Sequence, residues 1–157
     1  MESLGRSCIT HSPQETISLG EKLGKCLEGG EFILLRGPLG VGKTIFVKGI
    51  ARGLKVPSSV YVRSPSFTLL HIYQGRLPLY HFDLFRMKNA GDLTSIGWDE
   101  YLSGEGVVVV EWGDRFPDYL PSYLSIKLDF VEKDDERKIL VQSSDKRYAL
   151  LIERMFP

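Results

Sequence analysis

The chain has 157 residues, 43% of them hydrophobic, which is enough for one domain with a buried core and too few for two. Lysine and arginine together number 20, as do aspartate and glutamate, so the formal net charge is zero and no broad basic field exists to hold nucleic acid. The sequence shows no signal-peptide pattern and no apolar run long enough to cross a membrane. We therefore expect a single domain, 1–157, in the cytoplasm, with no membrane or DNA contact.

The first predicted elements are a helix, a strand and a second helix. Ser12-Pro13-Gln14-Glu15 is a capping-box pattern with proline at the first helical position, and leucines then recur at helical spacing until Gly29-Gly30. Residues 32–35 form a short continuous apolar run, which is typical of a strand buried on both faces. The pattern of residues 43–54 indicates a helix. The glycine-rich segment between them thus joins a strand to a helix.

That segment, GPLGVGKT, matches the phosphate-binding pattern GxxxxGK[ST]. Its glycines, Gly37, Gly40 and Gly42, allow the backbone N–H groups to converge on phosphate oxygens at the positive end of the following helix. Lys43 is expected to lie at the surface of the empty loop, where it can reach the β- and γ-phosphates of a nucleotide. The Thr44 hydroxyl is expected to be a ligand of the Mg²⁺ that bridges those phosphates. The segment therefore predicts a nucleotide site.

Two acidic residues at the ends of strand-like segments are candidates for holding the magnesium. Four valines precede Glu111, as expected of a buried central strand whose carboxyl end faces a ligand. In residues 79–85 the period of two places His81 and Asp83 on one face of a strand and Tyr80, Phe82 and Leu84 on the other. We interpret His81 as a packed or hydrogen-bonded core residue.

The segment between these elements is rich in aromatic residues. They alternate around the turn Gln74-Gly75-Arg76, which favours a β-hairpin packed on a core over a surface for stacking bases. Core packing is therefore expected for five of them: Phe67, Tyr73, Tyr80, Phe82 and Phe85. Three hydroxyl residues, Ser64, Ser66 and Thr68, precede this hairpin, and their position suits either a turn or a loop that senses the γ-phosphate. Further on, we expect a hairpin near 125–142, turning at the charged run 132–138, and a last helix near 145–155.

The ordered set GPLGVGKT, SPSFTL, HFDLFR, GWDEYL and VVEWGDR resembles the TsaE (YjeE) family, a small P-loop ATPase of bacterial tRNA threonylcarbamoyladenosine synthesis. The resemblance runs from about residue 12 to 115. It implies an α/β fold: a single P-loop NTPase-like domain with a mostly parallel central sheet, antiparallel hairpins and flanking helices. It also implies that ATP and Mg²⁺ are bound, that TsaD and TsaB are partners, and that tRNA is reached only through their complex.

The resemblance also implies roles for individual residues. Gly37 to Thr44, with Val41 inside the loop, become the ATP phosphate site, and Ile45 joins the residues that bind the cofactor. Thr44 and Glu111 become magnesium ligands. Asp83 becomes a second acid that acts on the metal, so Lys43, Asp83 and Glu111 form the expected catalytic set. Trp112 is placed beside the site, Ser66 in a switch-like loop, and Ser12 at the nucleotide. Pro38 departs from the family pattern and removes one N–H donor from the loop.

Two other function classes also fit a P-loop in a chain of this size. A small-molecule kinase needs an acceptor pocket and usually an arginine-bearing lid, and the arginine close to a motif is Arg86. The strand period directs Arg86 away from Asp83 unless the strand has already ended. A GTP-binding switch commonly reads guanine with an Asn/Thr-Lys-x-Asp motif, and this tetrad is absent from the sequence. Adenine is therefore the expected base.

Overall fold

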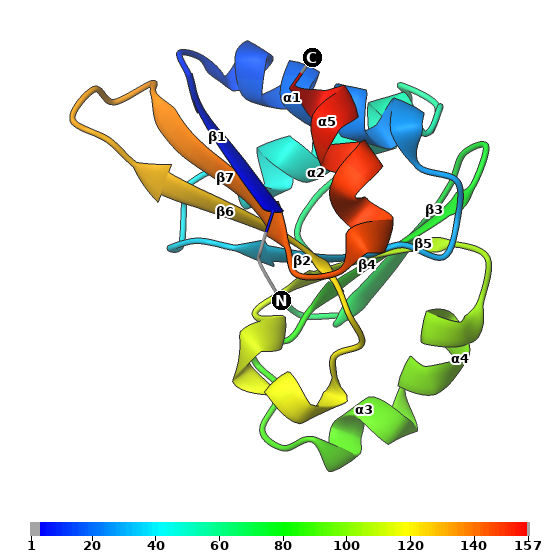
Figure 1. Ribbon diagram of the computed structural model, residues 1–157. Coiled ribbons are helices and arrows are strands. Elements are labelled where there is room, and N and C mark those ends of the chain that lie inside the picture. The colour runs from blue at the N-terminus through cyan, green and yellow to red at the C-terminus, as the bar shows by residue number, and fades with distance from the viewer. Residues whose placement is uncertain (1–3, 157) are drawn as a thin grey trace.

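The computed structural model describes residues 4–156, and these form one seven-stranded sheet in the order β1-β7-β6-β2-β5-β4-β3 (Figure 1). The strands are β1 (Leu4–Thr10), β2 (Phe32–Arg36), β3 (Leu70–Gln74), β4 (Pro78–Asp83), β5 (Val107–Glu111), β6 (Leu124–Phe130) and β7 (Arg137–Ser143). The helices are α1 (Pro13–Cys26), α2 (Lys43–Gly53), α3 (Gly91–Ser95), α4 (Trp98–Ser103) and α5 (Ala149–Met155). Short 3₁₀ turns lie at Gly113–Arg115, Pro117–Tyr119 and Lys146–Tyr148.

The centre of the sheet is parallel and its margins are antiparallel. Strand β2 runs parallel to both β5 and β6, and β4 runs parallel to β5. The hairpins β3–β4 and β6–β7 and the pair β1–β7 are antiparallel. This arrangement confirms the predicted α/β fold. It also brings the carboxyl ends of β2, β5 and β4 to the same edge of the sheet, where ligands of such folds are bound.

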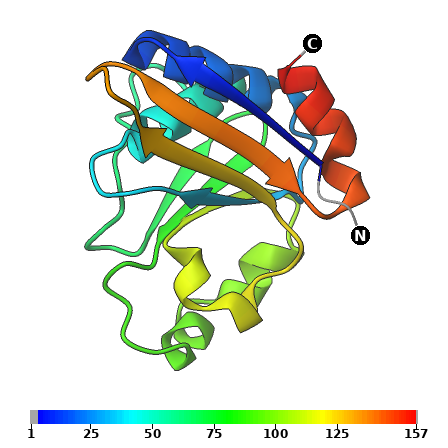
Figure 2. The same cartoon turned by 60° about the vertical axis from the view of Figure 1, so that its left-hand side comes forward.

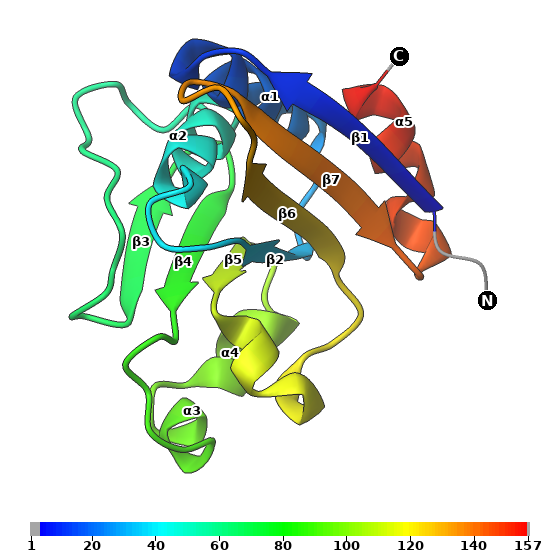
Figure 3. The same ribbon diagram turned by 90° about the vertical axis from the view of Figure 1, so that its left-hand side faces the viewer.

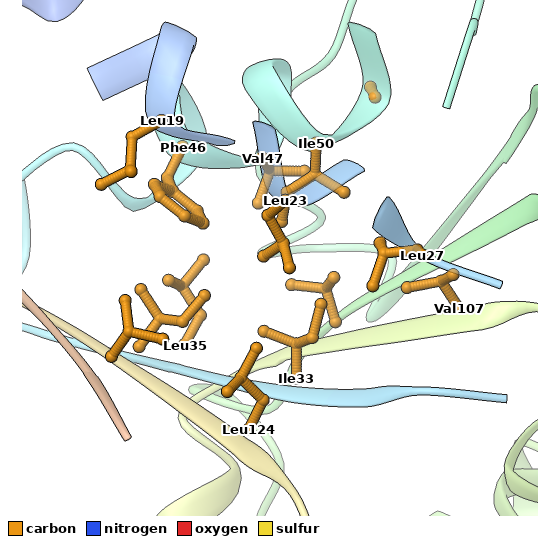
Figure 4. Close-up of a cluster of buried hydrophobic side chains, with 14 of the residues drawn as sticks. Leu19, Leu23, Leu27, Ile33, Leu35, Phe46, Val47, Ile50, Val107 and Leu124 are labelled. Carbon is orange, nitrogen blue, oxygen red and sulfur yellow. The ribbon is translucent and has the colours of Figure 1, made fainter. Parts of the chain in front are cut away.

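Helices cover both faces of the sheet, with α1, α2 and α5 on one side and α3 and α4 on the other (Figures 1 and 2). The larger core lies under α1 and α2, where leucines of α1 and the side chains of Phe46, Val47 and Ile50 of α2 meet the inward side chains of β2, β5 and β6 (Figure 4). A second core under α3 and α4 is built around Trp98, Phe82 and Phe32. The ring of Trp98 meets those of Phe32 and Phe82 edge to face, with centroids 5.9 Å and 5.1 Å apart.

The predicted start of α1 at Ser12 and Pro13 is confirmed, but the capping box is incomplete. Ser12 is the N-cap residue, and its Oγ accepts a hydrogen bond of 3.1 Å from the backbone N–H of Glu15, while Pro13 occupies the first helical position. The Glu15 carboxylate does not return to the backbone of Ser12 as a full capping box requires. It accepts instead from the backbone N–H of His11, at 2.6 Å.

The expectation that all five aromatic residues pack in the core is wrong for two of them. Tyr73 and Phe82 are buried and Tyr80 packs against the second core. Phe67 and Phe85, in contrast, are 81% and 50% exposed. Both lie outside the strands, Phe67 in the loop before β3 and Phe85 after the end of β4, so the alternation that buries strand residues does not apply to them.

Helices α1 and α2 approach so closely that their backbones touch. A Cβ atom added at Gly20 would lie 2.5 Å from the carbonyl oxygen of Phe46, and one added at Gly49 would overlap the carbonyl oxygen of Ile17. Such contacts exclude any side chain, because real Cβ atoms do not approach backbone that closely. The helix that follows the P-loop is therefore fixed to α1 through glycine.

We expect Gly49→Ala to lower the free energy of unfolding by about 2–3 kcal/mol, because the new methyl group forces the two helices apart. The matched control is Gly104→Ala, where an added Cβ meets atoms only at 3.5 Å and beyond, and which should change stability by less than about 1 kcal/mol. Urea denaturation followed by circular dichroism measures both. A Gly49→Ala midpoint equal to that of the native chain would show that the helices are not in backbone contact.

Candidate nucleotide-binding site

The P-loop runs from Gly37 to Gly42 between β2 and α2, in the backbone conformation that its glycines permit. Gly37, Gly40 and Gly42 have φ angles of 146°, 80° and 115°, values that favour glycine. Gly37 also has no room for a side chain, since its Cβ would lie 2.5 Å from the carbonyl oxygen of Leu128. Gly42 is the N-cap of α2 and offers no side-chain cap to the first N–H groups of that helix. This is the geometry of an anion site at a helix N-terminus.

Lys43 is buried rather than at the surface, so that part of the expectation is wrong. Only 6% of the residue is exposed, its Nζ donates a hydrogen bond of 2.8 Å to the Gly37 carbonyl, and it lies 4.1 Å from the centroid of the Trp112 ring. The reason is Trp112, whose φ of 63° turns the chain directly after β5 and brings the indole under the ammonium. The empty loop thus already contains a folded-back lysine.

Three acids act on the charge of Lys43. Burial lowers the pKa of the Lys43 ammonium, and the carboxylates of Glu111, Asp83 and Asp114 oppose that shift. A γ-phosphate would add negative charge to the same surroundings. An oxyanion bound in the loop is therefore expected to stabilise the charged form of the lysine further.

Asp83 and Glu111 lie side by side at the ends of β4 and β5. The two are register partners in the parallel ladder, so their side chains point to the same face of the sheet, and both are buried. Asp83 accepts a hydrogen bond at Oδ2 from the Ser64 hydroxyl, at 2.9 Å, and one at Oδ1 from the backbone N–H of Phe85, at 3.0 Å. The structure thus brings together the two acids that the sequence placed at strand ends.

His81 is a hydrogen-bonded core residue, as interpreted from the sequence, and its partner is Glu111. The ring is fully buried, and Nε2 lies 2.7 Å from Glu111 Oε2. Because a carboxylate only accepts, Nε2 carries the proton and donates it to this bond. The histidine fixes one oxygen of Glu111 and leaves Oε1 for another partner. The β-strand alternation places His81 and Asp83 on one face. It does not predict the hydrogen bond between His81 and Glu111 on the neighbouring strand.

The remaining predicted residues are less tightly grouped. Thr44 and Ile45 lie in the first turn of α2, directly after Lys43, and Val41 is buried within the loop. Ser66 lies in a turn of the loop before β3, two residues beyond the Ser64 that bonds Asp83. Ser12 caps α1. Thr10, two residues earlier, is paired with Arg137 on β7.

Arg137 is a site residue that sequence reasoning missed. Its Nε donates a hydrogen bond of 2.7 Å to the carbonyl oxygen of Val41 in the P-loop, and Nη1 donates one of 2.7 Å to the carbonyl of Glu136. The guanidinium also lies 4.7 Å from the centroid of the Phe130 ring. No motif marks this residue, because the contact joins positions almost a hundred residues apart that only the sheet order brings together.

Arg86 does not face the acids. Strand β4 ends at Asp83, and the guanidinium of Arg86 lies 4.3 Å from the centroid of the exposed Phe67 ring. Among residues 4–156, no group of three or more His, Cys, Asp and Glu side chains could hold a metal ion alone.

A protein-family comparison decides the relationship that this geometry suggests. The family model for "Threonylcarbamoyl adenosine biosynthesis protein TsaE" matches residues 10–139. The chain belongs to the TsaE family. TsaE proteins take part in the biosynthesis of threonylcarbamoyladenosine in tRNA, and the matched range contains the P-loop, both acids and Arg137.

Individual TsaE relatives agree with the family model. The TsaE of Treponema pallidum is 44% identical over 135 residues, covering 85% of this chain and 98% of that protein. The Bacillus subtilis TsaE is 38% identical over 150 residues, covering 93% of this chain and 90% of that protein. The crystal structure of Bacillus subtilis YdiB matches with a TM-score of 0.84 at 34% identity and covers 99% of this chain and 96% of that one. Within the described residues, no helix has the length and hydrophobicity needed to span a membrane.

Proposed function

We propose that this chain is the ATP-binding and ATP-hydrolysing subunit that works with TsaD and TsaB in forming threonylcarbamoyladenosine in tRNA, that it acts in the cytoplasm, and that it reaches the tRNA only through their complex. The observation that carries the proposal is the position of Lys43. Its Nζ bonds the Gly37 carbonyl, and the charges of Glu111 and Asp83 favour its ammonium form, at the edge of the sheet where P-loop folds bind nucleotides. Membership of the family supports the pathway.

The backbone of residues 37–44 would hold the phosphates of ATP, with Lys43 moving from Gly37 to the β- and γ-phosphate oxygens. Thr44 and Glu111 would hold Mg²⁺, which neutralises charge that develops during phosphoryl transfer. The donor set fits this ion, since a hydroxyl and a carboxylate are hard oxygen ligands. Pro38 removes one N–H from the loop, but it lies at the exposed tip, away from Lys43 and Thr44.

Glu111 suits direct contact with the metal better than Asp83. Both oxygens of Asp83 already accept hydrogen bonds from Ser64 and Phe85, whereas His81 engages only Oε2 of Glu111. Glu111 would therefore hold the metal through its free carboxylate oxygen, and Asp83 would act on it without direct contact. Ser64 belongs to the loop that also carries Ser66, so a change in the conformation of that loop would alter the hydrogen bond between Ser64 and Asp83.

Three arginines near the site are already engaged elsewhere. Arg86 stacks on Phe67, Arg137 bonds the P-loop carbonyl of Val41, and Arg115 donates to the carbonyl oxygens of Leu84 and Phe85 at 2.6 and 2.7 Å. An arginine finger supplied by a partner can be worth about 10³ to 10⁵ in rate. The site thus supports a partner-dependent ATPase.

We expect ATP hydrolysis by the purified chain to be slow and to rise at least about tenfold when TsaD and TsaB are added, which corresponds to about 1.4 kcal/mol of barrier. Steady-state phosphate release, measured with and without the two proteins and with and without Mg²⁺, tests this. TsaD and TsaB mixed with the Lys43→Ala chain give the background rate of phosphate release. Equal rates with and without partners, or fast transfer of phosphate to a small metabolite by the chain alone, would favour the kinase alternative.

A further inference from the structure

A polar cavity lies on the sheet face opposite α1 and α2, apart from the P-loop. It has a volume of about 190 Å³ and is lined by Arg36, Ser122, Tyr123, Ser125, Gln142, Ser143 and Ser144. Register pairs place Arg36 and Ser125 on the same face, and Gln142 is directly opposite Ser125 on the next strand. We call it the β6–β7 cavity. In Figure 3 this part of the sheet faces the viewer, and α1 and α5 lie behind it.

Two buried polar groups of this cavity have no hydrogen-bond partner among the described residues. One is Nε of Arg36, and the other is Oγ of Ser125, a residue that is only 3% exposed. Arg36 is also absent from the five ion pairs that the described residues form. A guanidinium N–H and a hydroxyl left unpaired in a buried position are costly unless something binds them.

The neighbouring acid does not neutralise Arg36. Asp145 lies in an adjoining open depression of about 550 Å³ that shares Ser122 and Ser144 with the β6–β7 cavity. Its carboxylate accepts from the backbone N–H of Arg147 at 2.9 Å, and this contact, with the Ser122 hydroxyl, holds the pKa of Asp145 below its usual value. No ion pair among the described residues joins this carboxylate to Arg36, so the guanidinium is not held by Asp145.

We propose that the β6–β7 cavity binds an oxyanion, the carboxylate or phosphate group of a small molecule. An arginine offers Nε–H and one Nη–H as a parallel pair that matches two oxygens of either group. The Ser125 hydroxyl, with the amide of Gln142 beside it, supplies further donors from the floor of the cavity. The space is several times the roughly 30 Å³ that one water occupies, so it admits a small oxyanion. The body of the ligand would extend into the depression beside Lys146.

The proposal is independent of the ATPase function and is tested by backbone amide NMR titration of the ¹⁵N-labelled full chain with inorganic phosphate and with succinate. Both probes should produce saturable shifts at residues 125, 142 and 144, with dissociation constants of about 1–10 mM. Phosphate also fits the P-loop, so shifts at residues 40–44 report that other site separately. Saturation by phosphate alone would assign a phosphate ester, by succinate alone a carboxylate, and by both a general oxyanion site.

Two variants and one control identify the groups involved. Arg36→Met keeps the apolar stem and should weaken binding at least about tenfold, as expected for loss of a charged hydrogen-bond pair. Ser125→Ala removes only the unpaired hydroxyl, leaves the fold intact, and should weaken binding about threefold. Lys138→Met, which removes an exposed charge from the same sheet face, should change binding less than about twofold. Shifts that rise linearly without saturating, or an equal loss in Lys138→Met, would overturn the proposal.

Discussion

Replacing Lys43 by alanine is expected to abolish ATP hydrolysis and to weaken ATP binding at least about a hundredfold, because the loop loses the cation that meets the phosphates. The structure changes what the substitution should do to stability. Nζ bonds the Gly37 carbonyl and lies over Trp112, so its loss should cost about 1–2 kcal/mol rather than the half kcal/mol of a surface site. Calorimetry with ATP and thermal melts measure the two effects.

Lys48→Ala is the matched control for this experiment. Lys48 lies in the same helix, and its Nζ contacts an aromatic ring, that of Tyr61 at 5.4 Å, but it points away from the P-loop. We expect it to leave ATP binding within about twofold of the native chain. If Lys43→Ala unfolded the chain at ordinary temperature, the lysine would be structural and the nucleotide proposal would lose its main support.

Changing Glu111 to glutamine should lower partner-stimulated ATP hydrolysis at least about a hundredfold while ATP affinity changes less than about threefold. The amide keeps an oxygen that can accept from His81 Nε2, so the fold should be retained, but it carries no charge for the metal. Asp114→Asn is the control. Asp114 is exposed, and this substitution also removes one negative charge from the surroundings of Lys43. It should retain at least about a third of the activity.

The outcome also separates the two acids. Asp83→Asn should reduce hydrolysis less than Glu111→Gln if Asp83 does not contact the metal directly. The asparagine side chain keeps an oxygen that can still accept the hydrogen bond from Ser64. A hydrolysis rate in Glu111→Gln equal to that of the native chain would contradict the assignment of Glu111 as the magnesium ligand. Nucleotide binding measured without Mg²⁺ should be the same for Glu111→Gln and the native chain.

The elements predicted correctly are those whose signals are local. The cap at Ser12, the apolar runs of β2 and β5, and the glycines of the P-loop each depend on neighbours within a few residues. Strand β1 escaped prediction because it is an edge strand, exposed along most of its length, and LGRSCIT lacks a regular apolar alternation. Helices α3 and α4 are too short to show a helical period.

The positions of the candidate site residues were predicted where the acids follow strands, and their long-range contacts were not predicted. Alternation placed His81 and Asp83 on one face, and both lie there. It gave no sign that His81 bonds Glu111 or that Ser64 bonds Asp83, because those pairs are 30 and 19 residues apart. The burial of Lys43 depended on the positive φ of Trp112, a conformation that a bulky residue seldom adopts and that sequence patterns do not predict.

The sheet order has a consequence for how the chain is made. The P-loop is synthesised early. Arg137, whose side chain donates a hydrogen bond to the Val41 carbonyl of that loop, belongs to β7 and is synthesised much later. Strand β7 pairs with β6 and with β1, which comes from the beginning of the chain. Contacts between such distant segments form only after both have left the exit tunnel. A nascent chain that ends before Arg137 therefore carries the complete P-loop motif without the arginine hydrogen bond to Val41. The loop reaches its final form only as synthesis is completed.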